Sequence, residues 1–204
     1  MILGGIIAGV LISGAVYLFT GVYVFGESPK QTIPIDEAES ADVVMLSYTV
    51  LEYIKDSDFV ALSHVIHPEY GVVLSPYATI NLATDRRFSA EQIAALDSDT
   101  NNYVWGIYNG SGEPIELTPV EYFAEFIPAA DHLKASIIGI NQIVRSGNAL
   151  ENITDVFPNV KFVDFHIPGD EQNADFNWSS LRLGFEEYDG YLRLIAIVYS
   201  KWTV

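Results

Sequence analysis

The first 26 residues, MILGGIIAGVLISGAVYLFTGVYVFG, contain no charged side chain, and the first acidic residue of the chain is Glu27. An uncharged apolar run longer than about 18 residues is typical of a membrane span, and as a helix this run would reach roughly 39 Å. A cleaved signal peptide is a second interpretation, although no Lys or Arg precedes the run and VYVFGES is a poor cleavage site. A third is a hydrophobic helix buried in a larger assembly. We predict an uncleaved anchor over residues 1–26.

The orientation of this anchor has a weak signal, because Lys30 is the only basic residue close to it. A chain with almost no N-terminal tail inserts most simply with its N-terminus inside. We therefore expect a single-pass protein of the cell membrane whose bulk is extracytoplasmic. The chain has no cysteine, which excludes a lipid-modified N-terminus, disulfides and thiolate metal sites.

The charge of the chain lies entirely after residue 26, where 27 acidic and 10 basic residues give a formal net charge of −17. Such a chain repels nucleic acid and anionic lipid headgroups. Its partners should be neutral, cationic or metal-bearing, and we expect a small molecule, a peptide or an envelope component. No sequence pattern points to a cofactor or to a resident metal ion.

The soluble part divides into a short linker and one domain. Residues 27–40 are polar, contain two prolines and lack periodicity, which is typical of a linker. Residues 41–204 have the length of a single domain. Its first half is predicted to be helical, with a cap at Ser40 or Asp42, a short helix stopped by Pro68, and later helices that begin at capping boxes. The helix-forming apolar residues of the first segment are Val43, Leu46, Val50, Leu51 and Ile54.

The second half of the domain alternates apolar and polar residues, as strands do. Four strands are predicted, at SIIGINQIV, NVKFVDFHI, SSLRLGFEEY and YLRLIAIVYSKWTV. Asp189-Gly190 between Tyr188 and Tyr191 favours a tight type I′ hairpin. Helices followed by an antiparallel sheet predict an α+β domain. We expect a curved antiparallel sheet around the helices, forming a cone with a pocket at its open end.

Two of these strands carry a polar face. Alternation places Asp164 and His166 together on one strand, and Arg182 and Glu186 together on the next. If the strands pair with these faces together, the cluster could perform general acid/base chemistry in a lined pocket. The same pattern fits the solvated outer face of a half-buried sheet. Both interpretations stay open here.

The stretch HPEYGVVLSPY, residues 67–77, contains Pro68, Gly71 and Pro76 and therefore cannot be regular throughout. We expect it to cross from helix to sheet near the mouth of the cone, where its polar residues either contact a ligand or fasten the loop by hydrogen bonds. His64 and His67 are three residues apart, but no third metal ligand is evident nearby. The predicted binding residues are His67, Ser75, Tyr77, Trp105, Tyr108, Trp178 and Trp202.

Three long stretches resemble a known family. These are ALSHVIHPEYGVVLSPYATI, YVWGIYNGSGEPIELTPVEYF and SLRLGFEEYDGYLRLIAIVYSKWT. Together they look like an uncharacterised extracytoplasmic domain of bacterial lipoproteins and membrane-anchored proteins, over roughly residues 45–204. The resemblance implies an NTF2-like cone and no known activity. The chain departs from that family at its N-terminus, where an apolar span replaces the lipobox cysteine.

The function that follows from these patterns is binding rather than catalysis. We predict a membrane-anchored extracytoplasmic domain that holds a small molecule, peptide or envelope component in an aromatic-lined pocket. One alternative is a small hydrolase or isomerase that uses His166 with Asp164, and Arg182 as an electrostatic stabiliser. Another is a structural subunit of a membrane or surface assembly.

Overall fold

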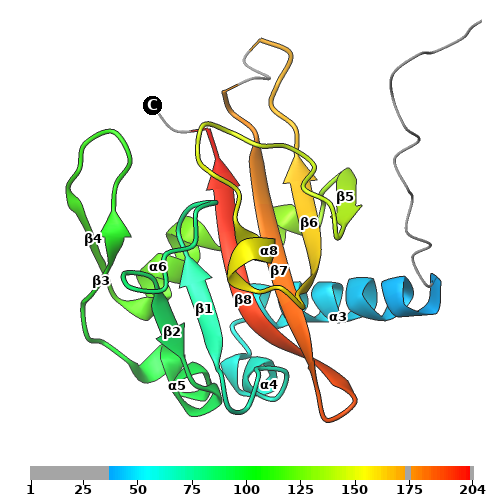
Figure 1. Ribbon diagram of the computed structural model, residues 1–204. Coiled ribbons are helices and arrows are strands. Elements are labelled where there is room, and N and C mark those ends of the chain that lie inside the picture. The colour runs from blue at the N-terminus through cyan, green and yellow to red at the C-terminus, as the bar shows by residue number, and fades with distance from the viewer. Residues whose placement is uncertain (1–36, 173–175, 203–204) are drawn as a thin grey trace, which may run out of the picture. The chain divides into compact units, whose positions relative to one another are not determined.

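The predicted α+β class is confirmed in the computed structural model, which describes residues 37–172 and 176–202, but its first four strands lie among the helices rather than after them. The fold is α+β (Figure 1). The predicted anchor, residues 1–26, lies outside the described residues, and none of the helices in the described part could cross a lipid bilayer. The helices are α3 (Glu37–Lys55), α4 (Phe59–Ser63), α5 (Ala90–Ala94), α6 (Pro119–Phe126), α7 (Ala129–His132) and α8 (Ile153–Val156), with a 3-10 turn η1 (Leu96–Ser98).

The strands form two sheets. The larger has six strands in the order β2-β1-β8-β7-β6-β5, and the smaller is the hairpin of β3 and β4. The predicted run of four C-terminal strands is confirmed, since β5 to β8 pair antiparallel in succession. The strands are β1 (Val72–Ser75), β2 (Arg86–Phe88), β3 (Tyr103–Ile107), β4 (Pro114–Leu117), β5 (Ile137–Ile140), β6 (Lys161–Ile167), β7 (Ser179–Tyr188) and β8 (Tyr191–Lys201).

The prediction of an all-antiparallel sheet was wrong, because β1 runs parallel to β8. The sequence of β1, VVLS, shows no alternation, and all four residues are buried. A strand that is covered on both faces has no polar side to mark its period, so the pattern of two disappears. The crossing from helix to sheet expected in residues 67–77 contains an inner strand of the sheet, β1, which the sequence pattern does not reveal.

Helix termini follow their local signals. The two capping boxes, Ser89 with Gln92 and Thr118 with Glu121, are both formed, and Pro119 occupies the first turn of α6. Helix α3 begins at Glu37, inside the segment that was interpreted as a linker. No proline follows Pro34 in this stretch, so nothing in the sequence prevents the helix from starting before its expected caps.

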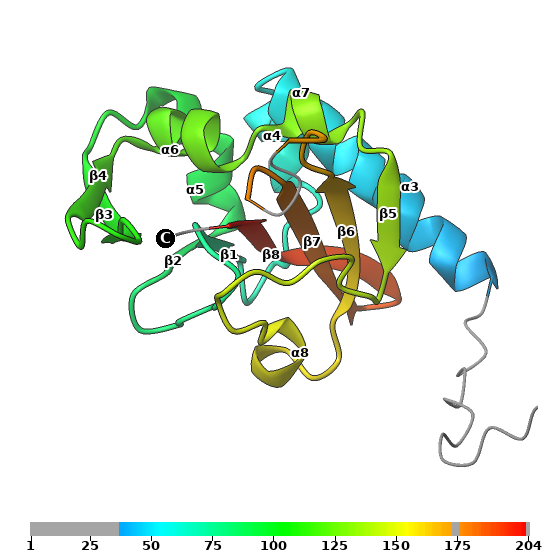
Figure 2. The ribbon, with the colours of Figure 1, turned by 90° about the horizontal axis from the view of Figure 1, so that it is seen from above.

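The sheet is covered on both faces (Figure 2). Helices α3, α4 and α7 lie over one face, where Val163, Phe165, Leu181 and Leu183 belong to the main core. Tyr48 of α3 meets Phe165 edge-on, with ring centroids 5.2 Å apart. Helix α8 covers part of the other face, over a second cluster that includes Phe162, Ile195 and Val198. The alternation predicted for β6 and β7 is confirmed by this division.

The C-terminal hairpin has the predicted turn. Tyr188 pairs with Tyr191, and Asp189 and Gly190 have φ angles of 53° and 78°. Positive φ at both central positions is the requirement of a type I′ turn. The turn is followed by regular pairing of β7 and β8 as far as Phe185, where the register shifts before the strands continue to Arg182.

Candidate functional site

A cleft of about 480 Å³ opens beside the C-terminal end of β1. Three separate segments line it: the connection from β1 to β2, the hairpin β3–β4, and a short stretch around residue 148. We call it the polar cleft because most of its lining side chains carry a hydroxyl, amide or carboxyl group. The lining residues are Ser75, Pro76, Tyr77, Thr79, Asn81, Thr84, Asp85, Gly106, Ile107, Asn109, Gly110, Asn148 and Ala149.

The first wall of the polar cleft begins where Pro76 ends β1. Ser75 Oγ donates a hydrogen bond to the Tyr77 carbonyl at 2.9 Å, which closes a tight turn. The Tyr77 hydroxyl then accepts a hydrogen bond from the Asn109 backbone N–H at 3.2 Å, and this links the turn to the β3–β4 hairpin. Burial raises the pKa of the Tyr77 hydroxyl, while the Asn109 N–H opposes that shift. Tyr77 is therefore neutral and available as a donor.

The second wall is the polar turn NLATD, residues 81–85. Asp85 Oδ2 accepts a hydrogen bond from the Asn81 backbone N–H at 2.9 Å, and Asn81 Oδ1 accepts one from Ala83 N–H at 3.0 Å. The Asn81 contact is an Asx turn, and the Asn81 N–H holds the Asp85 carboxylate in position. Burial raises the pKa of Asp85, and the Asn81 N–H partly opposes this. The cleft thus contains one partly desolvated carboxyl group among neutral hydrogen-bonding groups.

The third wall belongs to residues 141–152, which we call the strap. The strap joins β5 to α8 and passes over the face of the sheet opposite α3 (Figure 2). It is tied to the β1–β2 connection at one end: Asn152 Oδ1 accepts from Ile80 N–H at 2.8 Å, Asn152 Nδ2 donates to the Ile80 carbonyl at 2.9 Å, and Thr79 Oγ1 donates to the Leu150 carbonyl at 2.8 Å. These contacts position Asn148 and Ala149 at the cleft.

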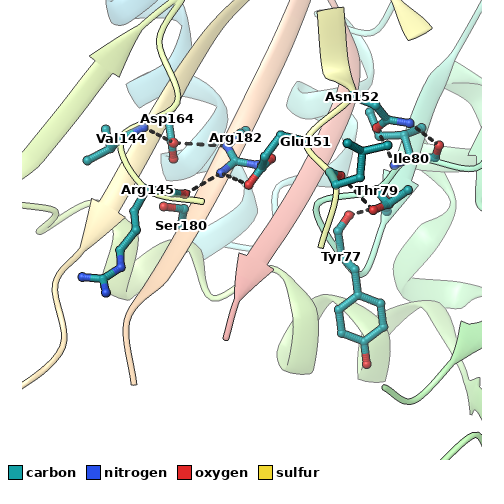
Figure 3. Close-up of polar contacts among 12 residues, drawn as sticks. Tyr77, Thr79, Ile80, Val144, Arg145, Glu151, Asn152, Asp164, Ser180 and Arg182 are labelled. Carbon is teal, nitrogen blue, oxygen red and sulfur yellow. Dashed lines mark hydrogen bonds and ion pairs between the residues drawn. The ribbon is translucent and has the colours of Figure 1, made fainter. Parts of the chain in front are cut away.

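The strap is tied to the sheet by Arg182. Arg182 Nε donates to Asp164 Oδ2 at 3.1 Å, and Nη1 and Nη2 both donate to the Glu151 carboxylate. Nη2 also donates to the Arg145 carbonyl at 3.2 Å, and Asp164 Oδ2 accepts from Val144 N–H at 2.9 Å. Figure 3 shows these groups converging beneath the strap. Burial raises the pKa of Glu151, and the Arg182 guanidinium opposes that shift.

The polar face predicted on β6 and β7 is therefore formed but covered. Asp164 lies opposite Arg182 in the register, as the paired-strand interpretation expected, whereas His166 lies opposite Ser180 and Glu186 accepts a hydrogen bond from Asn159. Asp164, His166 and Arg182 are all buried, so this face is not the solvated outer face of the sheet. None of the three lines the polar cleft. The hydrogen-bond partner of His166 Nδ1 is Ser180 Oγ, at 2.9 Å, and not Asp164 or Arg182.

The predicted binding residues separate into two groups. Ser75 and Tyr77 line the polar cleft, whereas the others lie elsewhere. His67 Nδ1 accepts hydrogen bonds from Glu69 N–H at 3.3 Å and Tyr70 N–H at 3.0 Å, so it fastens its own loop. Trp105 and Trp178 are buried, the Tyr108 hydroxyl donates to Glu125, and Trp202 lies against Phe176 with ring centroids 5.4 Å apart.

The space between α3 and the sheet is filled by side chains of the main core, among them Tyr48 and Phe165. Sequence reasoning missed Asn81, Asp85 and Asn148 as site residues. The turn NLATD was a usable signal for the first two, because Asn and Asp stabilise turns through their own side chains. Nothing near Asn148 indicated that it meets a segment some 70 residues earlier in the chain.

Metal binding by His64 and His67 finds no support in the contacts of either residue. His64 is exposed and His67 is buried against Tyr188, with ring centroids 4.8 Å apart. Over residues 37–172 and 176–202, no group of three or more His, Asp or Glu side chains is placed to hold a metal ion.

Comparison with known proteins adds no family. The sequence matches no protein-family model, and no curated protein is significantly similar to it. The functional argument therefore depends on the geometry of the chain itself.

Proposed function

We propose that the polar cleft binds a small polar molecule that carries hydroxyl or ammonium groups. The observation that carries this proposal is the gathering of hydrogen-bonding side chains from three distant segments around one partly buried carboxyl group, Asp85. A concave site with fixed polar groups is the usual form of a small-molecule site. The formal net charge of −17 disfavours an anionic ligand and favours a neutral or cationic one.

Of the binding residues predicted from the sequence, we propose Ser75 and Tyr77 as ligand contacts. We add Thr79, Asn81 and Asn109, which line the same cleft. Each is held by a hydrogen bond within the chain, and such preorganisation lowers the ordering cost of binding. The lining is mostly polar, so we propose a polar ligand in place of the aromatic-lined site expected from the sequence.

The ligand proposal is tested by calorimetric titration with two probe sets, neutral monosaccharides and small amines such as putrescine. Binding of a probe from either set is expected, and Asp85→Asn should weaken amine binding by about tenfold or more because a charge-assisted hydrogen bond is lost. Glu116→Gln is the matched control, since Glu116 is exposed on β4 outside the cleft. Absence of binding by both sets, or equal losses in the two variants, would contradict the proposal.

We also propose that the domain is NTF2-like and is displayed outside the cytoplasmic membrane on residues 1–26. The uncharged apolar sequence of that segment supports this placement, and the α+β class of the domain, with helices packed on one face of its sheet, supports this family. Protease added to intact spheroplasts should digest the domain if it faces outward. Digestion only after lysis would show that it faces the cytoplasm.

A further inference from the structure

A second cavity, of about 530 Å³, has no lining residue in common with the polar cleft. It lies beside α7, the start of β7 and the end of β8. Its lining residues are Glu125, Pro128, Asp131, His132, Lys134, Ile167, Ser179 and Tyr199. Two of these, Ser179 and His132, form a pair that neither the sequence patterns nor the polar cleft accounts for.

His132 is held in one tautomer by the backbone. Its Nδ1 lies 3.0 Å from the Pro128 carbonyl oxygen, which can only accept a hydrogen bond, so Nδ1 carries the proton. In the neutral ring Nε2 is then the acceptor, and it lies 3.4 Å from Ser179 Oγ. The hydroxyl therefore donates toward Nε2. The ring is further fixed edge-on against Tyr199, with centroids 6.2 Å apart.

This arrangement contains the parts of an activated serine nucleophile. Such a site needs a hydroxyl within hydrogen-bond reach of a base, and a third group that orients the base; the nucleophile–base distance is often longer in a protein without substrate. Here the Pro128 carbonyl is the orienting group. Burial lowers the pKa of His132, although the Pro128 carbonyl opposes that shift, so the ring is neutral and able to accept a proton at pH 7.

We propose that Ser179 and His132 form a second site, which performs acyl transfer from small carboxylic esters. Ser179 Oγ attacks the ester carbonyl carbon, its proton passes to His132 Nε2, and the C–O bond to the alcohol breaks as that proton reaches the leaving oxygen. Water then attacks the acyl-serine, delivers its proton through Nε2 back to Oγ, and releases the carboxylic acid. The Tyr199 hydroxyl and the Lys134 ammonium, which line the same cavity, are the donors available to a negatively charged oxygen.

The test uses the full chain and a fluorophosphonate probe, whose phosphorus is attacked by an activated serine with loss of fluoride. One adduct per chain on Ser179 is expected by intact mass and peptide mapping, with slow hydrolysis of p-nitrophenyl acetate. Ser179→Ala should abolish both reactions, and Ser136→Ala, at an exposed serine near α7, should leave both unchanged. No adduct on the folded chain, or an adduct that persists in Ser179→Ala, would overturn the proposal.

A second readout separates catalysis from folding. His132→Gln should slow labelling by about 100-fold or more through loss of the base. In the unmodified protein the labelling rate should rise with pH to a plateau, with a midpoint below 6.5 because the pKa of His132 is lowered. A midpoint near 8 or above, or no dependence on pH, would overturn the assignment of His132 as base. The charged and titratable groups around this ring are Asp131, Lys134 and Glu125 on the helical side and Asp164, His166 and Tyr199 on the sheet.

Discussion

Arg182→Met is expected to lower the free energy of unfolding by about 3–5 kcal/mol, the usual cost of removing one partner from a buried ion pair. The change leaves two carboxylates, that of Asp164 on β6 and that of Glu151 in the strap, without their shared cation. Asp164 is fully buried, and within the described part of the chain its Oδ1 has no hydrogen-bond partner. Chemical denaturation at pH 7 measures the loss.

The control for this prediction is Arg87→Met. Arg87 is exposed and lies over the Tyr70 ring at 5.0 Å, a contact that contributes less than about 1 kcal/mol. Acidification offers a further check. The Arg182 guanidinium opposes the burial that raises the pKa of Glu151, so removing it should raise that pKa further in the folded state. Glu151 should then bind a proton more readily in the folded variant than in the unfolded chain. The deficit of Arg182→Met should therefore shrink between pH 7 and pH 5, and a deficit that grows on acidification would contradict this account.

Trp105→Ala is the second large effect, with an expected loss of about 3–5 kcal/mol in the free energy of unfolding. Trp105 is completely buried, and its ring stacks on Tyr122 with centroids 3.9 Å apart and on Phe88 at 5.5 Å. Its Nε1–H donates to the Leu117 carbonyl at 2.8 Å, and truncation leaves that acceptor without its partner. Trp105 therefore stabilises the β3–β4 hairpin against α6 rather than contacting a ligand.

The matched control is Trp202→Ala, because Trp202 is half-buried near the end of the described residues and its ring contacts Phe176. Its loss should be less than about 1 kcal/mol. Urea titration of both variants by circular dichroism makes the comparison. Similar small losses in the two would show that Trp105 contributes little to the core and would return it to the set of candidate ligand contacts.

The elements that could be predicted from the sequence are those in which a local rule and the tertiary environment agree. Both capping boxes, the Asp189-Gly190 turn and the antiparallel set β5–β8 were predicted because cap chemistry, positive φ and alternation act over a few residues. Strand β1 was missed because burial on both faces removed its alternation. Strand β5 ends at Ile140, earlier than expected, where Asn141 takes a φ of 50°.

The candidate site was less accessible to sequence reasoning because it depends on contacts between distant segments. The polar face of β6 and β7 was correctly paired, but its cover could not be foreseen, since the strap has no regular pattern. Asn152 and Ile80 are bonded across 72 positions of sequence. The Ser179–His132 pair has a separation of 47 positions and no motif around either residue. Such contacts between distant residues can be recognised only once the arrangement of the strands and loops in space is known.

The position of β8 between β1 and β7 has a consequence for how the domain is made. Strands β2 and β1 leave the ribosome early, but no partner joins them to β5, β6 and β7 until residues 191–201 have been synthesised. Until then the nascent chain holds two separate pieces of sheet, each with an unpaired edge that another chain could occupy. Completion of the sheet therefore waits for β8, and factors that shield open edges should matter more for the yield of the domain than for its final stability.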